Sequence, residues 1–171
     1  MDRLWSPWRS KYIESFANET TESKSEGQCL FCRVLSDPVK DEENLVVIRG
    51  SACIIMMNLY PYNSGHLMIV PFTHTGDISG LSESESSEMM QSARRCAETL
   101  TETIHPHGFN IGMNIGRVSG AGIESHVHLH VVPRWNGDTN FMPVLADTRI
   151  ISEALEDTYR KLREALKRKK P

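Results

Sequence analysis

The sequence has no long apolar run. Its longest wholly apolar stretch covers residues 52–57, whereas a helix that crosses a membrane needs about 20 such residues. Residues 1–13 carry charged and tryptophan side chains and lack the apolar segment of a secretory signal peptide. These absences argue against a membrane protein and against a secreted one. We therefore expect a cytoplasmic protein with no membrane partner.

An excess of basic residues is also missing. The chain has 171 residues, with 19 Lys and Arg against 22 Asp and Glu, and its formal net charge is −3. This balance gives no argument for nucleic acid as a partner, and the short basic cluster at 167–170 is interpreted as a solvated helix end or tail. The length and the hydrophobic content of 39% predict a single globular domain over residues 1–171 with one sizeable core.

The chain has four cysteines, and their spacing is informative. Cys53 and Cys96 stand among apolar residues and are predicted to be buried free thiols. Cys29 and Cys32 form a Cys-x-x-Cys pair, which in a reducing compartment is either half of a metal site or a redox pair. Because no strand–helix pattern of the thioredoxin type surrounds the pair, the metal site is favoured.

Hydrophobic periodicity predicts an α+β fold. Ser82 and Glu85 form a capping box that opens a long helix ending near His105. Apolar residues at helical spacing from Ile151 to Leu166 predict a C-terminal amphipathic helix. The order of elements favours an antiparallel sheet with one long central helix and a C-terminal helix packed on it. The strands are expected at 45–49, 52–58, 66–71, 109–114 and 126–132.

Residues 119–143 hold the most informative pattern in the chain. His126, His128 and His130 alternate there with hydrophobic residues. Successive side chains of an extended strand point to opposite faces. The three imidazoles are therefore predicted to share one face, while the intervening hydrophobic residues enter the core.

Periodicity alone leaves three interpretations of these histidines open. They are structural residues, or they form a three-histidine metal site, or one is a nucleophile that the others tune. Gly116, Gly120 and Gly122 lie just before them. Such a loop lets backbone N–H groups approach an anion closely, which favours a chemical role.

The stretch 126–134, HVHLHVVPR, resembles the His-φ-His-φ-His-φ-φ signature of the histidine triad (HIT) family, in which φ is a hydrophobic residue. The similarity extends to Asn58, to GHLMIVP at 65–71 and to NIG at 114–116. It implies a HIT-like fold over the whole chain. The implied division is an N-terminal arm and linker at 1–28, a HIT core at 29–135 and a C-terminal extension with a helix at 136–171.

Further segments resemble one branch of this family, the bacterial diadenosine tetraphosphate (Ap4A) phosphorylases. These segments are LWSP at 4–7, NLYPYN at 58–63, PHGFN at 106–110 and PRWNGDTNF at 133–141. With them, the resemblance covers nearly the whole chain.

The resemblance implies nucleotidyl transfer or hydrolysis at an α-phosphate through a covalent nucleotidyl-histidine. His128 falls at the position of the nucleophile. His130 and His66 fall where they would stabilise phosphate charge or protonate the leaving group. Asn58 stands where the family holds the ribose hydroxyls. The phosphate oxygens would be held by Asn114 and by backbone groups near Ser119, Gly120, Ala121 and Gly122.

The resemblance also implies a zinc site. In family members with a Cys-x-x-Cys pair, the metal is completed by the histidine after the strand-ending proline and by the first triad histidine. In this chain these are His74 and His126. Cys29, Cys32, His74 and His126 then form a closed tetrahedral set, which is typical of structural zinc.

The chain departs from one family pattern. Many HIT hydrolases carry Ala-Gly-Gln shortly before the triad, and the glutamine reaches the substrate phosphates. Here 119–125 is SGAGIES, without glutamine. The small side chains leave room for a second anion, so inorganic phosphate is predicted to accept the nucleotidyl group, and Ap4A to give ADP and ATP. Arg134 or Arg117 is a candidate source of positive charge nearby.

Two other functions stay open on the sequence. One is a hydrolase of dinucleoside polyphosphates or nucleoside phosphoramidates that uses water as acceptor. The other is a non-catalytic, zinc-stabilised nucleotide-binding module. For assembly, the resemblance implies a homodimer as the minimum unit, paired through the sheet and the long helix. Trp5 and Trp8 of the aromatic arm are candidates for contacts in a larger assembly.

Overall fold

The computed structural model describes residues 29–139 and 153–168. The predicted aromatic arm, the linker that follows it and the first residues of the predicted C-terminal helix lie outside these ranges. Within the described residues, no helix is both long and apolar enough to cross a membrane.

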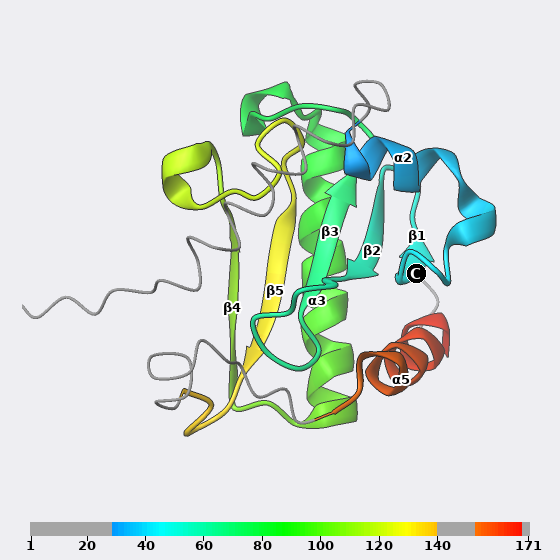
Figure 1. Ribbon diagram of the computed structural model, residues 1–171, viewed down its shortest axis with the longest axis vertical. Coiled ribbons are helices and arrows are strands. Elements are labelled where there is room, and N and C mark those ends of the chain that lie inside the picture. The colour runs from blue at the N-terminus through cyan, green and yellow to red at the C-terminus, as the bar shows by residue number, and fades with distance from the viewer. Residues whose placement is uncertain (1–28, 140–152, 169–171) are drawn as a thin grey trace, which may run out of the picture.

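The chain forms a five-stranded sheet in the order β1-β2-β3-β5-β4, and every neighbouring pair is antiparallel. Figure 1 shows α3 behind the sheet and β4 at its left-hand edge. The α+β fold with an antiparallel sheet is therefore confirmed. The strands are β1 Val46–Arg49, β2 Cys53–Met57, β3 Leu67–Pro71, β4 Gly108–Met113 and β5 Leu129–Arg134.

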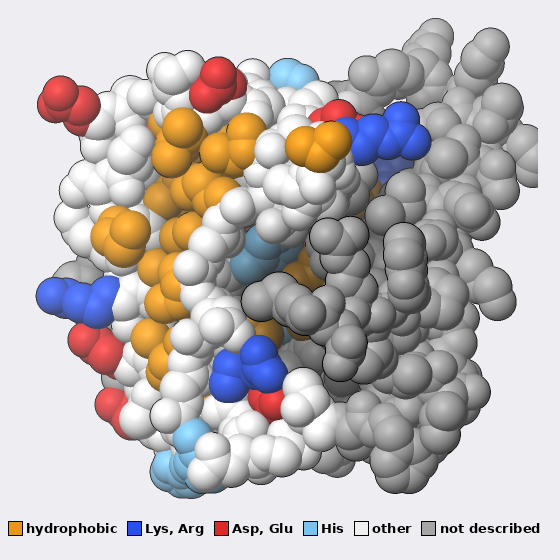
Figure 2. All heavy atoms as spheres, turned by 90° about the vertical axis from the view of Figure 1, so that its left-hand side faces the viewer, with side chains coloured by type: hydrophobic (Ala, Val, Ile, Leu, Met, Phe, Trp, Pro, Cys, Tyr) orange, Lys and Arg blue, Asp and Glu red, His pale blue; other side chains and the backbone are white. Residues whose placement is uncertain are grey.

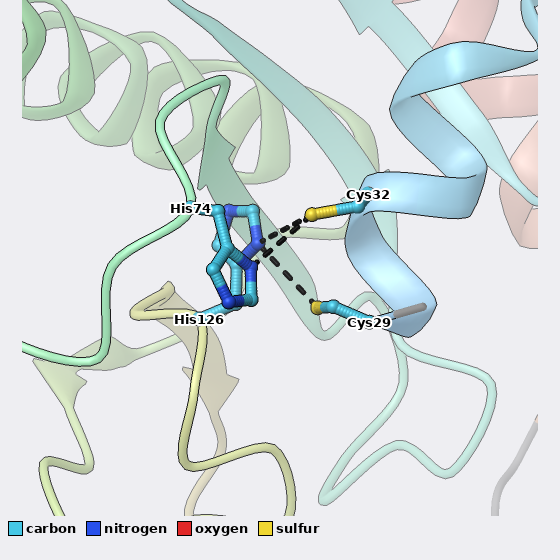
Figure 3. Close-up of side chains that lie close together, drawn as sticks. All are labelled: Cys29, Cys32, His74 and His126. Atoms are coloured by element: carbon cyan, nitrogen blue, oxygen red, sulfur yellow. Dashed lines mark hydrogen bonds between the residues drawn. The ribbon is translucent and has the colours of Figure 1, made fainter. Parts of the chain in front are cut away.

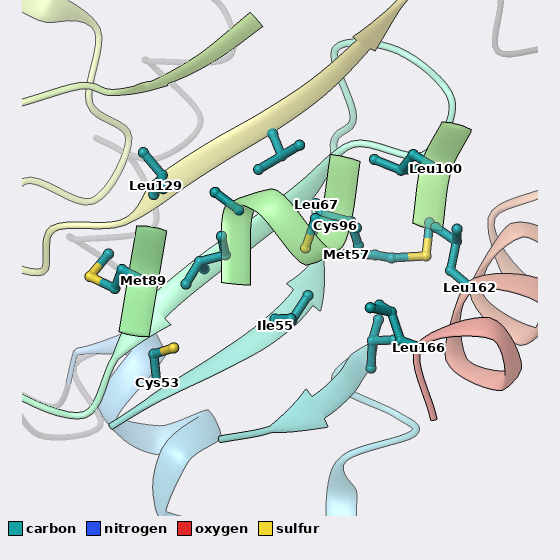
Figure 4. Packing of buried hydrophobic residues seen from close by; sticks show 14 of the residues in the cluster. Cys53, Ile55, Met57, Leu67, Met89, Cys96, Leu100, Leu129, Leu162 and Leu166 are labelled. Carbon is teal, nitrogen blue, oxygen red and sulfur yellow. The ribbon is translucent and has the colours of Figure 1, made fainter. Parts of the chain in front are cut away.

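Two helices cover one face of the sheet. The capping box of α3 (Glu83–Ile104) is confirmed, because the Ser82 hydroxyl accepts from the Glu85 N–H and the Glu85 carboxylate accepts from the Ser82 N–H. This helix and α5 (Leu155–Arg168) bury apolar side chains against the sheet. Figure 4 shows Leu100, Leu162 and Leu166 meeting the strand residues in this core. Cys53 and Cys96 lie in the same core as free thiols, as predicted.

The opposite face carries a short helix that periodicity did not predict, α2 (Leu30–Ser36). It has seven residues, too few to be stable in isolation or to show a helical repeat in the sequence. Phe31 and Val34 bury their side chains against Ile54, Met56 and Met68 of the sheet. Packing on the sheet therefore stabilises α2. Three 3₁₀ turns complete the described structure: η1 Pro38–Lys40, η2 Ile78–Gly80 and η3 Arg117–Ser119.

The strand that was predicted to hold all three triad histidines begins later than expected, at Leu129. His126 and His128 precede it, because the described pairing of β5 with β3 and β4 begins at Leu129. The Val127 N–H is satisfied instead by the Thr75 carbonyl. The shared face nevertheless holds: the Phe31 ring of α2 contacts both His126 and His128, and His128 contacts His130.

Candidate active site and metal centre

A cavity of about 190 Å³ lies between α2 and the sheet. Its apolar wall comes from Leu30, Phe31 and Val34 on α2 and from Met56 and Met68 on the strands. At the β5 side it is lined by the polar residues Asn114, His128 and His130. The cavity therefore joins an apolar slot to a cluster of imidazoles.

His66 and His130 form a hydrogen-bonded pair whose protonation follows from their partners. The Tyr62 N–H lies 3.1 Å from His66 Nδ1, and an amide N–H can only donate, so Nδ1 of neutral His66 is an acceptor. His66 Nε2 then carries the proton and donates to His130 Nδ1 at 3.0 Å. The proton of neutral His130 is consequently on Nε2, which is buried and has no hydrogen-bond partner within the described residues. The site thus presents an unused N–H donor.

The surroundings of His130 favour its neutral form over the cation. Burial, and next the nearby His128, lower the pKa of His130 to about 4. A neutral imidazole N–H stabilises negative charge through a hydrogen bond, without an ionic attraction. This refines the prediction for His130, which left the form of charge stabilisation open.

His128 has the opposite arrangement. Its Nδ1 lies 2.9 Å from the carbonyl oxygen of His126, and a carbonyl can only accept, so Nδ1 carries the proton. Nε2 therefore keeps its lone pair. Burial lowers the pKa of His128, which favours this unprotonated nitrogen at neutral pH. Such an imidazole has the form that a nucleophile requires.

The predicted substrate-binding residues are only partly at the cavity. Asn58 and Asn114 line it, and the Asn58 amide is oriented by the Tyr60 N–H, which donates to its oxygen at 3.0 Å. In the predicted loop, Gly120 and Gly122 line the cavity. Ala121 is absent from the lining, and so is Ser119, whose hydroxyl donates back to the Gly116 carbonyl.

Arg134 is excluded as a source of charge at this site. Its guanidinium donates to the Asp138 carboxylate at 2.6 and 2.7 Å and to the Asn110 side chain at 2.7 Å. It pairs with Gly108 at the end of β5, whereas His130 pairs with Gly112. Arg117 is exposed and also absent from the cavity lining. Among the described residues that line the cavity there is no Lys or Arg.

The four predicted metal ligands come together. Cys29 and Cys32 lie at the start of α2, His74 follows β3 and His126 precedes β5, and their ligand atoms all lie within 4.8 Å of one another. Figure 3 shows the two imidazoles pointing at the two sulfurs. His126 Nδ1 lies 3.5 Å from Cys29 Sγ and 3.7 Å from Cys32 Sγ, and His74 Nδ1 lies 3.2 Å from Cys32 Sγ.

These distances fit a tetrahedral metal ion. Zn–S bonds of about 2.3 Å and Zn–N bonds of about 2.0 Å place neighbouring ligand atoms about 3.5 Å apart. The His126 tautomer also fits, because its Nε2 donates to the Pro71 carbonyl at 3.0 Å and leaves the Nδ1 lone pair facing the sulfurs. Burial, and next the nearby Cys29 sulfur, raise the pKa of the Cys32 thiol. A bound cation would remove this unfavourable effect of two neighbouring thiolates.

The His74 ligand loop is tied to the long helix. Thr73 donates to the Glu85 carboxylate, and this bond, together with those from Ser82, lowers the pKa of Glu85 to about 2. The carboxylate that caps α3 therefore also holds the residue next to His74. The sequence showed the capping box, but not its link to Thr73.

Other contributors to the site were also missed in the sequence. Phe31 packs against two triad histidines, and its place between the two cysteines in an apolar segment was the one available signal. Tyr62 and Pro71 act through their backbone groups. Side-chain identity carries no information about such backbone contacts.

A family profile, a similar sequence and a similar structure all relate the chain to histidine triad proteins. The HIT domain profile matches residues 39–137. The chain is 37% identical over 163 residues to a protein of Mycobacterium tuberculosis (strain ATCC 25618 / H37Rv) named AP-4-A phosphorylase. The aligned region covers 95% of this chain and 83% of that protein. A zinc-bound histidine triad family protein from Mycobacterium smegmatis has a similar structure, with a TM-score of 0.66, 29% identity and coverage of 82% of this chain and 94% of that one.

A more distant likeness concerns the fold alone. A structure of uridylyltransferase matches with a TM-score of 0.66 at 16% identity, covering 95% of this chain and 51% of that one.

Proposed function

The chain belongs to the HIT domain family, and on that premise we propose that it cleaves Ap4A by phosphorolysis, giving ADP and ATP. One observation carries this proposal. His128 lies in the cavity with Nδ1 hydrogen-bonded to a carbonyl and with Nε2 free to attack. The relative named AP-4-A phosphorylase supports the choice of substrate and of acceptor.

In the first step, His128 Nε2 forms a bond to the α-phosphorus of Ap4A, and the bond from that phosphorus to the bridging oxygen breaks. ATP leaves, and AMP stays attached to the imidazole. The positive charge that develops on the ring is stabilised by the Nδ1–H bond to the His126 carbonyl. The His130 Nε2–H donates to an oxygen of the reacting phosphate.

In the second step, an oxygen of inorganic phosphate attacks the same phosphorus, and the Nε2–P bond breaks. ADP leaves, and His128 regains its lone pair. The overall change is Ap4A plus phosphate to ADP plus ATP, which balances. Bound phosphate gains from proximity to the adduct, whereas water has no comparable anchor.

Binding is assigned to neutral groups, because no basic side chain lines the described part of the cavity. The Asn58 side-chain oxygen accepts from the Tyr60 N–H, and its nitrogen contacts His66 Nδ1. The second lone pair of the oxygen and the second N–H of the amide would hold the ribose hydroxyls. Asn114 and the backbone at Gly120 and Gly122 would hold phosphate oxygens. Gly120 has φ 87°, a conformation that suits glycine and turns the backbone sharply.

Zinc is proposed as a structural ion held by Cys29, Cys32, His74 and His126. When bound, it would supply a cross-link between α2, the segment after β3 and the segment before β5. His126 is both a ligand and the residue whose carbonyl orients His128. The four ligand residues therefore fix the position of the nucleophile and take no part in bond making.

The choice of acceptor is open to a direct test. Wild-type protein with Ap4A and millimolar phosphate is expected to give ADP and ATP, resolved by chromatography. Gly122→Gln places a long amide at the cavity and is expected to raise the share of AMP, because it competes with phosphate for space. Ala121→Gln is the matched control, since residue 121 is not in the lining. If the wild-type protein gives only AMP and ATP, it is a hydrolase.

A homodimer paired through the sheet edge is also proposed. β4 ends the sheet, and Ile111 on it is 46% exposed. Figure 2 shows hydrophobic side chains gathered in a band on the side of the molecule that carries β4. An exposed apolar edge strand favours pairing with another strand, and two copies would pair symmetrically.

Light scattering is expected to give the mass of a dimer at micromolar concentration. Ile111→Lys is expected to shift the protein to a monomer, because it places charge on the paired edge. Val118→Lys serves as the control, since Val118 is fully exposed and lies outside β4. A wild-type monomer would contradict the proposal. The cytoplasmic location, the single-domain division and the role of the Trp5 and Trp8 arm stay predictions.

A further inference from the structure

Glu43 and Asn44, two polar residues that the reaction above does not use, also line the cavity. They lie just before β1, whereas His128 and His130 belong to the β5 side, three strands away in the sheet order. Three strand spacings amount to about 14 Å. A nucleoside monophosphate has a comparable extended length, so a nucleotide with its phosphate at His128 would extend its base toward the β1 side of the cavity.

The apolar walls of the cavity can hold a nucleotide base, but they do not discriminate between one base and another. Phe31 and Val34 on α2 and Met56 and Met68 on the sheet are apolar and belong to one packed cluster. Apolar walls accept any planar ring of suitable size and discriminate weakly between isosteres. Selection among bases therefore needs a polar group at the edge of the ring.

The backbone around Asn44 is fixed. The Asn44 N–H donates to the Lys40 carbonyl at 2.8 Å, and the Leu45 carbonyl accepts from the Met57 N–H at 2.9 Å. Leu45 has φ 58°, in the left-handed region that leucine rarely adopts. Unfavourable backbone conformations of this kind concentrate at binding sites, where the surrounding contacts enforce them.

Arg49 connects the segment before β1 to α2, the helix on one side of the cavity. Its guanidinium donates to the Asp41 carboxylate and to the Val34 and Leu35 carbonyls of α2. Arg49 therefore links the segment before β1 to α2, whose Val34 lines the cavity. A segment held by several hydrogen bonds can present a side chain to a ligand at a defined distance.

Asn44 is better placed than Glu43 to read a base. Asn44 is a half-buried residue whose side chain makes no hydrogen bond within the described residues, whereas Glu43 is exposed. A hydrogen bond discriminates strongly only where water is displaced. An amide offers one acceptor and two donors, which match the exocyclic amine and a neighbouring ring nitrogen of adenine.

We propose that the Asn44 amide accepts a hydrogen bond from the exocyclic amine of adenine and donates one to the adjacent ring nitrogen, so that the site selects an adenine nucleotide for transfer. This rests on the proposed function, because it places the transferred AMP in the same cavity. It adds the base preference, which the chemistry at His128 does not determine.

The test compares two ligands on three proteins. AMP and purine riboside 5′-monophosphate differ only in the exocyclic amine, and their binding is measured by calorimetry on wild type, Asn44→Leu and Glu43→Gln. Wild type is expected to bind AMP about tenfold more tightly than the analogue. Asn44→Leu is expected to lose this preference through weaker AMP binding alone. Glu43→Gln, the matched control, is expected to keep it.

Equal binding of both ligands by wild type overturns the proposal, and this comparison needs no substitution that could disturb folding. Equal weakening of both ligands in Asn44→Leu also overturns it. The reaction is tested separately by Ap4A turnover. A preference for AMP without Ap4A turnover supports the Asn44 contact and rejects the proposed reaction. Ap4A turnover without a preference for AMP supports the reaction and rejects the Asn44 contact.

Discussion

Replacing His128 by asparagine is expected to lower Ap4A turnover by a factor of about 10⁴ or more, because losing a nucleophile removes the covalent route. Asparagine keeps a polar side chain in the cavity but offers no unprotonated ring nitrogen. Binding of AMP is expected to persist, since the apolar walls and Asn58 are unchanged. Steady-state kinetics and calorimetry measure the two effects separately.

The covalent step has its own readout. Wild-type protein mixed with Ap4A labelled at the α-phosphorus and without phosphate is expected to keep label after denaturation, whereas His128→Asn keeps none. His130→Ala is expected to be less severe, at about a hundredfold, because it removes one hydrogen-bond donor. His105→Asn is the matched control: His105 is exposed, and asparagine tolerates its left-handed φ of 48°. Activity of His128→Asn within tenfold of wild type would exclude the assignment.

The second large effect concerns the metal. Wild-type protein is expected to contain about one zinc ion per chain, and Cys29→Ser is expected to contain almost none. The loss in free energy of unfolding is on the order of 4 kcal/mol, since metal loss is among the few mechanisms that exceed ordinary substitutions. For a chain of this length this corresponds to a fall in Tm of about 10 °C. Elemental analysis and thermal unfolding measure both.

Cys53→Ser is the control for metal content, because Cys53 is a free thiol in the core and lies outside the ligand group. A chelator is expected to lower the Tm of wild type and of Cys53→Ser, and to leave Cys29→Ser unchanged. Wild-type protein that is free of metal and yet equally stable would refute the site. Wild-type protein with a disulfide between Cys29 and Cys32 would favour the redox interpretation instead.

The tautomers support the different roles that are proposed for His128 and His130, although the sequence makes the two residues alike. His128 meets a carbonyl that can only accept, whereas the His66–His130 pair begins at an amide N–H that can only donate. The two rings are therefore protonated on opposite nitrogens. One presents a lone pair, and the other presents an N–H, which is the division that nucleophilic attack on a phosphate needs.

Local and periodic features were determined by the sequence itself. The alternation at 126–130 places three imidazoles on one face, because extended backbone has a period of two. Ser82 and Glu85 open α3 through contacts three residues apart. The resemblance to the HIT family picked out Cys29, Cys32, His74 and His126, and the fold brings these four side chains together.

Only the tertiary structure decided the remainder, because those features depend on residues distant in the chain. Helix α2 forms by packing on the sheet, and its sequence is too short to show a helical repeat. The sequence made Arg134 a candidate source of positive charge near the substrate phosphates, but in the fold its guanidinium binds Asp138 and Asn110. Asn44 gave no signal in the sequence, because its proposed role depends on its position in the fold. It lines the same cavity as His128 and His130, and it lies beside β1, three strands from β5. Residue identity states which hydrogen bonds and charges a side chain can offer, whereas the packing of distant segments decides what each one meets.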